Sequence, residues 1–122
     1  MTSTAAALAD QYFAMWNEKD EDRRGKIIEE AWSTDGVFVD PSFEVKGHQG
    51  LSEMVAAAHR LFPGHAFALT GTIDEHHNRL RWTWNLAADN TEPVAGGTDV
   101  VTLDAKGKIQ EVIGFLNFAP AH

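Results

Sequence analysis

The sequence predicts an α+β domain that forms a cone-shaped barrel. Three N-terminal helices pack against a curved, mostly antiparallel sheet. Two observations carry this prediction. Apolar residues recur at helical spacing through most of the first half of the chain, and they alternate at strand spacing through the second half. Helices followed by antiparallel strands are typical of α+β folds.

The composition indicates one globular domain, residues 1–122. A hydrophobic content of 43% is enough for a core, and a formal net charge of −8 disfavours nucleic acid and anionic membranes. There are no cysteines, which fits a reducing compartment. With neither a signal-peptide pattern nor an apolar run of about 18 residues, we expect a cytoplasmic protein that does not associate with membranes.

Two helices are expected first. Ser3 or Thr4 can cap a helix over residues 5–19. One stripe of this helix carries Leu8, Tyr12, Met15 and Trp16. Asp20 or Asp22 can cap the second helix. Its inward residues are expected to be Ile27, Ile28, Ala31 and Trp32.

A short strand and a third helix should follow. The strand is expected over residues 37–40 and is stopped by Pro41. The helix starts after Gly47 or Gln49 and ends at Pro63-Gly64. It has the clearest amphipathic pattern in the chain, formed by Leu51, Met54, Val55, Ala58, Leu61 and Phe62.

Four strands are expected in the second half. The first carries Phe67, Leu69 and Ile73 on one face. The second carries Leu80, Trp82, Trp84 and Leu86 on one face, and Arg79, Arg81, Thr83 and Asn85 on the other. The third covers residues 94–103 and the fourth residues 109–118. Loops are expected at residues 89–92 and 104–107, with Gly107 where a positive φ is needed.

Asp99 is the most informative polar residue. It shares its strand face with Ala95, Gly97, Val101 and Leu103. A lone carboxylate on an apolar face must raise its pKa or find a partner if it is buried. Two interpretations stay open. In the first, this face lines a pocket. In the second, the face looks outward, or Asp99 pairs with an arginine of the sheet such as Arg81.

Asp40 and Tyr12 are further candidates. Asp40 precedes Pro41, and this pair commonly starts a turn, so a catalytic role is one of two alternatives. Tyr12 is the only tyrosine, and core packing with one hydrogen bond is the alternative to catalysis. Trp82 and Trp84 could line a hydrophobic ligand site or fill the interior.

No metal site or cofactor is expected. His76 and His77 are adjacent, and neighbouring strand residues point to opposite faces, so the pair cannot hold one ion without a bulge. The other histidines, His48, His59, His65 and His122, have no ligand spacing. Phosphate-loop, dinucleotide and serine-hydrolase motifs are absent from the sequence.

The segments YFAMWNEKD, DGVFVDP, GHQGLSEMV, RWTWNL, GGTDVVTLDAKGKI and EVIGF resemble, in this order, the nuclear transport factor 2-like superfamily. They are most similar to its bacterial SnoaL-like members. The resemblance covers residues 8–118 and implies the cone-shaped fold and a homodimer formed through the sheet. This superfold hosts isomerases, cyclases and pure binding domains, so the resemblance is specific for fold rather than for function.

At site positions the sequence is most similar to ketosteroid isomerases. The resemblance implies an ionised Asp40 as general base, with Tyr12 and a neutral Asp99 donating hydrogen bonds to an enolate oxygen. Trp32 and Val55 replace the tyrosines that support the oxyanion tyrosine in that family. The residues expected to line the pocket are Trp16, Trp32, Met54, Val55, Trp82, Trp84, Val101, Val112 and Leu116.

These observations predict a pocket for a small apolar molecule that carries a carbonyl group, with cofactor-free isomerisation or enolisation as its chemistry. The alternatives are a pocket that binds without catalysis and a domain that serves mainly for dimerisation. A protein-binding domain should expose an aromatic patch on the outer face of the sheet.

Overall fold

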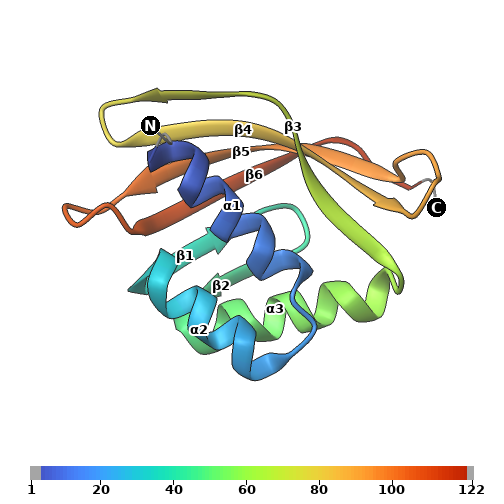
Figure 1. Ribbon diagram of the computed structural model, residues 1–122, viewed down its shortest axis with the longest axis horizontal. Coiled ribbons are helices and arrows are strands. Elements are labelled where there is room, and N and C mark those ends of the chain that lie inside the picture. Colours follow the sequence, from blue (N-terminus) through green and yellow to red (C-terminus); the bar gives the residue numbers. More distant parts are fainter. Residues whose placement is uncertain (1–3, 121–122) are drawn as a thin grey trace.

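The computed structural model describes residues 4–120, so Ser3 and His122 lie outside it. The elements are α1 (Thr4–Asn17), α2 (Glu21–Ala31), β1 (Trp32–Val39), β2 (Glu44–Lys46), α3 (Gly47–Leu61), β3 (His65–His76), β4 (Arg79–Ala88), β5 (Ala95–Leu103) and β6 (Ile109–Phe118). Figure 1 shows the three helices on one side of the sheet, which confirms the α+β prediction. Within residues 4–120, no helix has both the length and the apolar character needed to cross a membrane.

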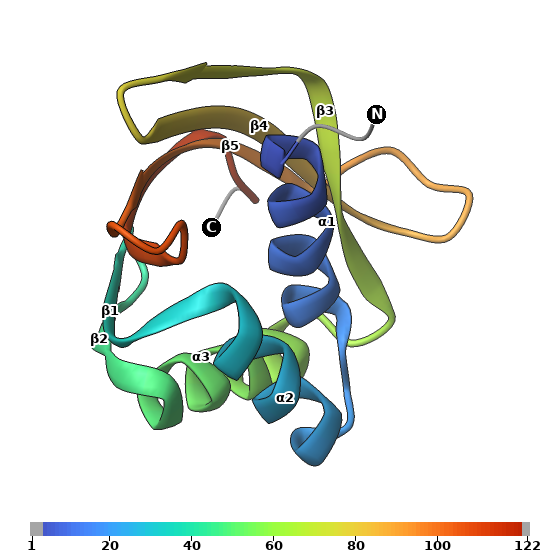
Figure 2. The same ribbon diagram turned by 60° about the vertical axis from the view of Figure 1, so that its left-hand side comes forward.

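The sheet is mixed and strongly curved. Its six strands run in the order β2-β1-β6-β5-β4-β3, and β1 pairs with β6 in parallel while every other pair is antiparallel. Since β2 and β3 are the two ends of this order, the sheet does not close into a complete barrel. Figure 2 shows the sheet bending around α1, with α2 and α3 across the open side.

Side chains define the junction between α1 and α2. Asn17 ends α1 two residues before the predicted end. Its Nδ2 donates to the carbonyl of Phe67 and its Oδ1 accepts from the Phe67 N–H, both at 2.8 Å, which joins α1 to β3. Of the two candidate caps of α2, Asp20 is the one used, because its carboxylate accepts from the N–H of Arg23 at 2.9 Å.

Trp32 corrects the predicted boundary between α2 and β1. It was expected on the inner face of the helix, but the helix ends at Ala31 and Trp32 begins the strand, five residues before the predicted start. Gly36 makes room for this arrangement, because a Cβ there would lie 2.6 Å from the Trp32 ring. The three-residue β2, which pairs with β1, has too short an apolar pattern to be predicted.

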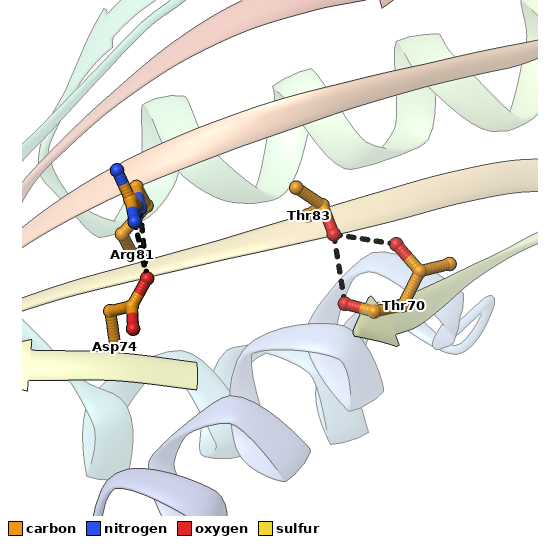
Figure 3. A network of polar contacts seen from close by, with 4 residues as sticks. All are labelled: Thr70, Asp74, Arg81 and Thr83. Atoms are coloured by element: carbon orange, nitrogen blue, oxygen red, sulfur yellow. Dashed lines mark hydrogen bonds and ion pairs between the residues drawn. The ribbon is translucent and has the colours of Figure 1, made fainter. Parts of the chain in front are cut away.

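A bulge in β3 interrupts the predicted alternation of Phe67, Leu69 and Ile73. The pairing of β3 with β4 shifts between Thr70 and Asp74, and Gly71 has a φ of +67° there. On the two sides of the bulge, the Thr83 hydroxyl donates to the Thr70 carbonyl at 2.8 Å and Arg81 forms an ion pair with Asp74 (Figure 3). Arg81 therefore pairs with Asp74, not with Asp99.

The outer face of the sheet is polar on β4, whereas β5 and β6 also expose apolar residues there. Val100 on β5 lies opposite Ile113 on β6, and two residues further along β6 Phe115 lies opposite Thr98. Val100, Ile113 and Phe115, which we call the outer patch, are 36%, 37% and 59% exposed. The exposed Phe115 was not predicted, because only the polar residues of β4 were expected on this face.

We predict that the outer patch joins two copies of the chain into a homodimer, because uncovered apolar residues on one sheet face are typical of interaction surfaces. Ile113→Asp should shift the particle measured by light scattering from dimer to monomer. Arg79→Asp, at the end of β4 and outside the patch, should leave it a dimer. A wild-type particle of 13.4 kDa at about tens of micromolar would contradict the prediction.

Candidate functional site

A cavity of about 460 Å³ lies between α1, the end of α3 and the concave face of the sheet. Its wall is largely aromatic and includes Phe13, Trp16, Phe38, Phe67 and Trp84. The polar groups in this wall come from Tyr12, Asp40, Ser42 and Asp99. An apolar cavity with a few converging polar groups is the usual form of a small-molecule site.

Asp99 reaches this cavity from the middle of β5 and is only 2% exposed. Its Oδ2 accepts two hydrogen bonds at 3.0 Å, one from the Tyr12 hydroxyl on α1 and one from the Trp82 indole N–H on β4. Among residues 4–120, Oδ1 accepts no direct hydrogen bond and lies beside Gly114, and the Trp84 indole in the cavity wall also favours the ionised carboxyl group, with a smaller effect than Trp82 and Tyr12. Oδ2 is thus held by two donors, and Oδ1 is the less constrained oxygen.

Gly114 separates the two candidate carboxyl groups. A Cβ at this position would lie 3.0 Å from Asp99 Oδ1 and 3.2 Å from the Cβ of Asp40. Any side chain here would therefore occupy the space between the aspartates. Because Gly114 has no side chain, both carboxyl groups can open onto the same part of the cavity.

Asp40 follows β1 and forms the turn that its Asp-Pro pair predicts. Its Oδ1 accepts from the backbone N–H groups of Ser42 and Phe43, each at 2.8 Å, which forms a turn. The same residue lines the cavity. The turn fixes the carboxyl group and leaves Oδ2 without a hydrogen bond from residues 4–120.

Burial raises the pKa of Asp99 to about 6, against the opposing effect of the hydrogen bonds from Trp82, Tyr12 and Trp84, while the charge of Asp40 raises it further. Burial also raises the pKa of Asp40, although the N–H groups of Ser42 and Phe43 oppose the change. A pKa of about 6 favours the neutral form of Asp99 below that pH and the ionised form above it.

Tyr12 remains a hydrogen-bond donor. Burial, followed by the charge of Asp99, raises its pKa well above the ordinary value, so the hydroxyl keeps its proton. That proton is directed at Asp99. The ring is fixed by Phe13, Trp16, Trp32 and Trp82, whose centroids lie 5.1–6.5 Å away. The resemblance placed this hydroxyl against the substrate, whereas here it holds the carboxyl group.

The predicted lining residues divide into two groups. Trp16, Trp84 and Leu116 lie in the cavity wall. The remaining six are packed in the core instead, and these are Trp32, Met54, Val55, Trp82, Val101 and Val112. Trp82 is withdrawn from the cavity because α1 covers it and Asp99 accepts its N–H. The indole nitrogen of Trp32 is buried and has no partner among the described residues, for which we have no physical account.

Several wall residues were not predicted. Phe38 shares strand parity with Asp40, so the alternation of β1 could have identified it. Phe13 follows Tyr12 on α1, three residues before Trp16. Phe43 depends on the turn after β1, which has no periodic signal. The aromatic residues missed in this way lie on elements that also carry a predicted site residue or lie next to one, and smaller wall residues such as Ser42, Ala95 and Gly114 were missed as well.

In residues 4–120, no three histidine, aspartate or glutamate residues come close enough to hold a metal ion. His76 and His77 do approach, with their Nδ1 atoms 3.2 Å apart. His77 lies in the turn after β3 with a φ of +47°, so the strand-parity argument against this pair was wrong.

Known proteins resemble this chain in both sequence and structure. The sequence matches the SnoaL-like domain family over residues 9–112. The structure superposes, with a TM-score of 0.90, on a protein from Agrobacterium tumefaciens strain C58 that is provisionally described as an isomerase of the SnoaL-like family. The two are 41% identical, over 95% of this chain and 99% of that chain. None of the functionally curated proteins matches the sequence significantly.

Two more distant structures share the fold. A provisional ketosteroid isomerase from Kribbella flavida is 16% identical, with a TM-score of 0.69 over 98% of this chain and 82% of that chain. A provisional polyketide cyclase from Sinorhizobium meliloti is 13% identical, with a TM-score of 0.69 over 93% and 99%. The fold and its cavity thus define a domain of the nuclear transport factor 2-like superfamily. Within it, the chain belongs to the SnoaL-like domain family.

The raised pKa of Asp99 predicts a pH-dependent stability. A pKa that is higher in the folded state stabilises the protein fully below the unfolded value of 3.8, and this contribution is lost as the pH rises through about 6. The loss corresponds to about 3 kcal/mol in the free energy of unfolding. Urea denaturation between pH 4 and pH 7 should show this loss in the wild type.

In Asp99→Asn, the free energy of unfolding should not fall between pH 4 and pH 7 in this way, because the amide does not titrate. The amide oxygen can still accept hydrogen bonds from Tyr12 and Trp82, so the variant should fold. Asp10→Asn, which changes an exposed carboxylate on α1, is the matched control and should follow the wild type. Parallel curves for Asp99→Asn and the wild type would show that Asp99 titrates as it does in the unfolded chain.

Proposed function

We propose that the chain binds a small apolar molecule with a carbonyl group in this cavity and catalyses a cofactor-free proton transfer next to the carbonyl. The observation that carries the proposal is the pair of carboxyl groups that opens onto one aromatic cavity on both sides of Gly114. Groups with raised pKa values in a cavity are typical of acid–base sites.

The two aspartates are suited to different roles. The Asp40 carboxylate would take a proton from the carbon next to the carbonyl, and the electron pair of that C–H bond would form the enolate. Protonated Asp99 would donate a hydrogen bond through Oδ1 to the enolate oxygen. In a substrate whose carbon–carbon double bond is conjugated with this enolate, return of the proton from Asp40 to the far carbon would shift the double bond, re-form the C=O bond and restore the enzyme.

Tyr12 and Trp82 act through Asp99 in this mechanism. Both donate to Oδ2, which turns Oδ1 toward the cavity and fixes its position. We therefore assign Tyr12 as a positioning residue rather than as a second donor to the substrate. This differs from the arrangement that the resemblance to ketosteroid isomerases implies.

The similar proteins support the class of chemistry. The Agrobacterium protein is described as an isomerase, and the two more distant ones as a ketosteroid isomerase and a polyketide cyclase. Isomerisation of a ketone and cyclisation of a polyketide both pass through enolates. The shared element is a carbonyl compound with an acidic C–H bond.

The outer patch supports a second candidate, a domain that mainly dimerises. Its exposed Phe115 is the aromatic residue expected of a protein-binding surface. Dimerisation leaves the buried carboxyl pair without a role, so a catalytically silent protein with an intact dimer would favour this candidate.

The catalytic prediction concerns exchange of the acidic proton. Small apolar ketones in D₂O should exchange the hydrogens next to their carbonyl group faster with the protein present, followed by NMR. Asp40→Asn should lower this rate by about 10²–10⁴-fold, because the base is lost. The rate should decline as the pH rises above about 6, where Asp99 loses its proton.

Variants of Asp99 provide the control. Asp99→Asn keeps a donor toward the cavity and should remove the decline above about pH 6. Asp99→Leu removes the donor and should cost about 10²–10³-fold. Equal rates for the wild type and Asp40→Asn would overturn the proposed role of Asp40.

The binding prediction uses tryptophan fluorescence. An apolar ketone in the cavity should change the emission of Trp16 and Trp84, which line it. Trp84→Phe should reduce the response, because one of the two reporters is removed while an aromatic wall remains. Asp40→Asn should retain the full response. A panel of apolar ketones that leaves the wild-type emission unchanged would contradict binding in this cavity.

A further inference from the structure

A second cavity, of about 360 Å³, lies where the α1–α2 junction meets the end of α3. Four of its eight lining residues can carry positive charge: Lys19, Arg24, His59 and His65. None of the eight is acidic. In a chain with a net charge of −8, this local arrangement runs against the overall balance of charge.

Arg24 is the centre of this cluster. It is 4% exposed, and no carboxylate in residues 4–120 forms an ion pair with it. Its Nε donates to the Ser52 hydroxyl at 2.9 Å and its Nη1 to the Glu18 carbonyl at 2.8 Å. A guanidinium has five N–H groups, so these bonds use two of them, and Nη2 has no partner among the described residues. A buried cation without a counter-charge is costly, and an anion in the cavity would supply the missing charge.

The nearby acidic side chains do not supply that charge. The carboxylate of Glu18 accepts from the N–H of Asp20, and the carboxylate of Asp20 caps α2 through the N–H of Arg23. Neither residue lines the cavity. Among residues 4–120, no carboxylate is paired with Arg24, which leaves the cavity open to an anion from outside.

The two histidines each present a free ring nitrogen. His59 Nε2 donates to the Trp16 carbonyl at 2.7 Å, which leaves its Nδ1 free. His65 Nδ1 donates to the Pro63 carbonyl at 3.0 Å, which leaves its Nε2 free. Both imidazoles are oriented by hydrogen bonds to backbone carbonyls, and such bonds commonly orient the residues of binding sites.

We propose that this cavity binds a phosphoryl group, either as free phosphate or as the terminal phosphate of a larger ligand. A guanidinium and an ammonium, joined by the second ring nitrogens of His59 and His65 when these imidazoles are protonated, offer more donors and charge than a single carboxylate can use, whereas a phosphate has about −1.5 to −2 charges and three acceptor oxygens. This inference goes beyond the proposed function and does not rest on it.

The position of Phe62 determines how the two sources can be distinguished. Phe62 lines both this cavity and the aromatic one, so a ligand with a phosphate here lies next to the aromatic site. A phosphate carried by an apolar chain would therefore contact Phe62, and free phosphate would not need to.

The test is a titration of the ¹⁵N-labelled protein with inorganic phosphate at constant ionic strength. The amide signals of Gly64 and His65 should shift and saturate, and acetate at equal concentration should bind at least about tenfold more weakly. Hexyl phosphate is the second arm. Tighter binding than phosphate, with shifts at Phe62, would indicate a ligand-borne phosphate, and equal binding would indicate free phosphate.

Matched variants assign the site. Arg24→Met should weaken phosphate binding by about tenfold or more, since hydrogen bonds to charged groups contribute roughly 1.5–3 kcal/mol. Arg23→Met removes the same charge from the exposed neighbouring position and should bind as the wild type does. If Arg24→Met does not fold, as judged by circular dichroism, the exposed Lys19 is substituted instead. Lys19→Met should weaken phosphate binding, and Lys26→Met, outside the cavity, should not.

Equal effects of the lining and control variants would overturn the proposal, because they would show a non-specific response to charge. Acetate binding as tight as phosphate binding, or the absence of saturable shifts in the wild type, would also overturn it.

Discussion

The hydrogen bonds to Asp99 Oδ2 are the interaction on which the site depends. They join three elements that are distant in the sequence, because Tyr12 lies on α1, Trp82 on β4 and Asp99 on β5. A buried carboxylate costs less when two donors face it. The same two bonds therefore make burial of Asp99 tolerable, attach α1 to the concave face and leave one oxygen toward the cavity. Packing and chemistry share a single carboxyl group.

A second constraint is that residue 114 on β6 is a glycine. Gly114 lies between Asp99 and Asp40, and these residues come from strands that flank β6 in the sheet. Because the two carboxyl groups are fixed by different means, one by side-chain donors and one by a backbone turn, their environments differ. Burial raises both pKa values, and the more enclosed group titrates near pH 6. Divergent environments around one cavity are what acid–base chemistry requires.

Much of this arrangement could be predicted from periodicity. Alternation along β5 placed Asp99 on the same face as Ala95 and Val101 but left open whether that face looks inward, and helical spacing placed Tyr12 on the stripe that contacts Asp99. Alternation does not show which inward residue meets a cavity and which meets another helix. Trp82 and Trp84 have the same parity, yet α1 covers the first and leaves the second in the cavity wall. Arg24 was missed for a related reason, since a charged residue on a polar helix has no pattern that indicates burial.

The side chain of Asn17 has a consequence for how the molecule behaves in a crowded solution. β3 is an end strand of the sheet, and the Asn17 amide occupies both the N–H and the C=O of Phe67 on its free side. A strand from another molecule cannot pair with these groups while the amide is there. The bulge near Gly71 interrupts the rest of that edge, and the opposite edge is the three-residue β2. Irregular or short edges resist edge-to-edge aggregation, so one helix-terminal asparagine helps keep a strongly curved open sheet from forming fibres.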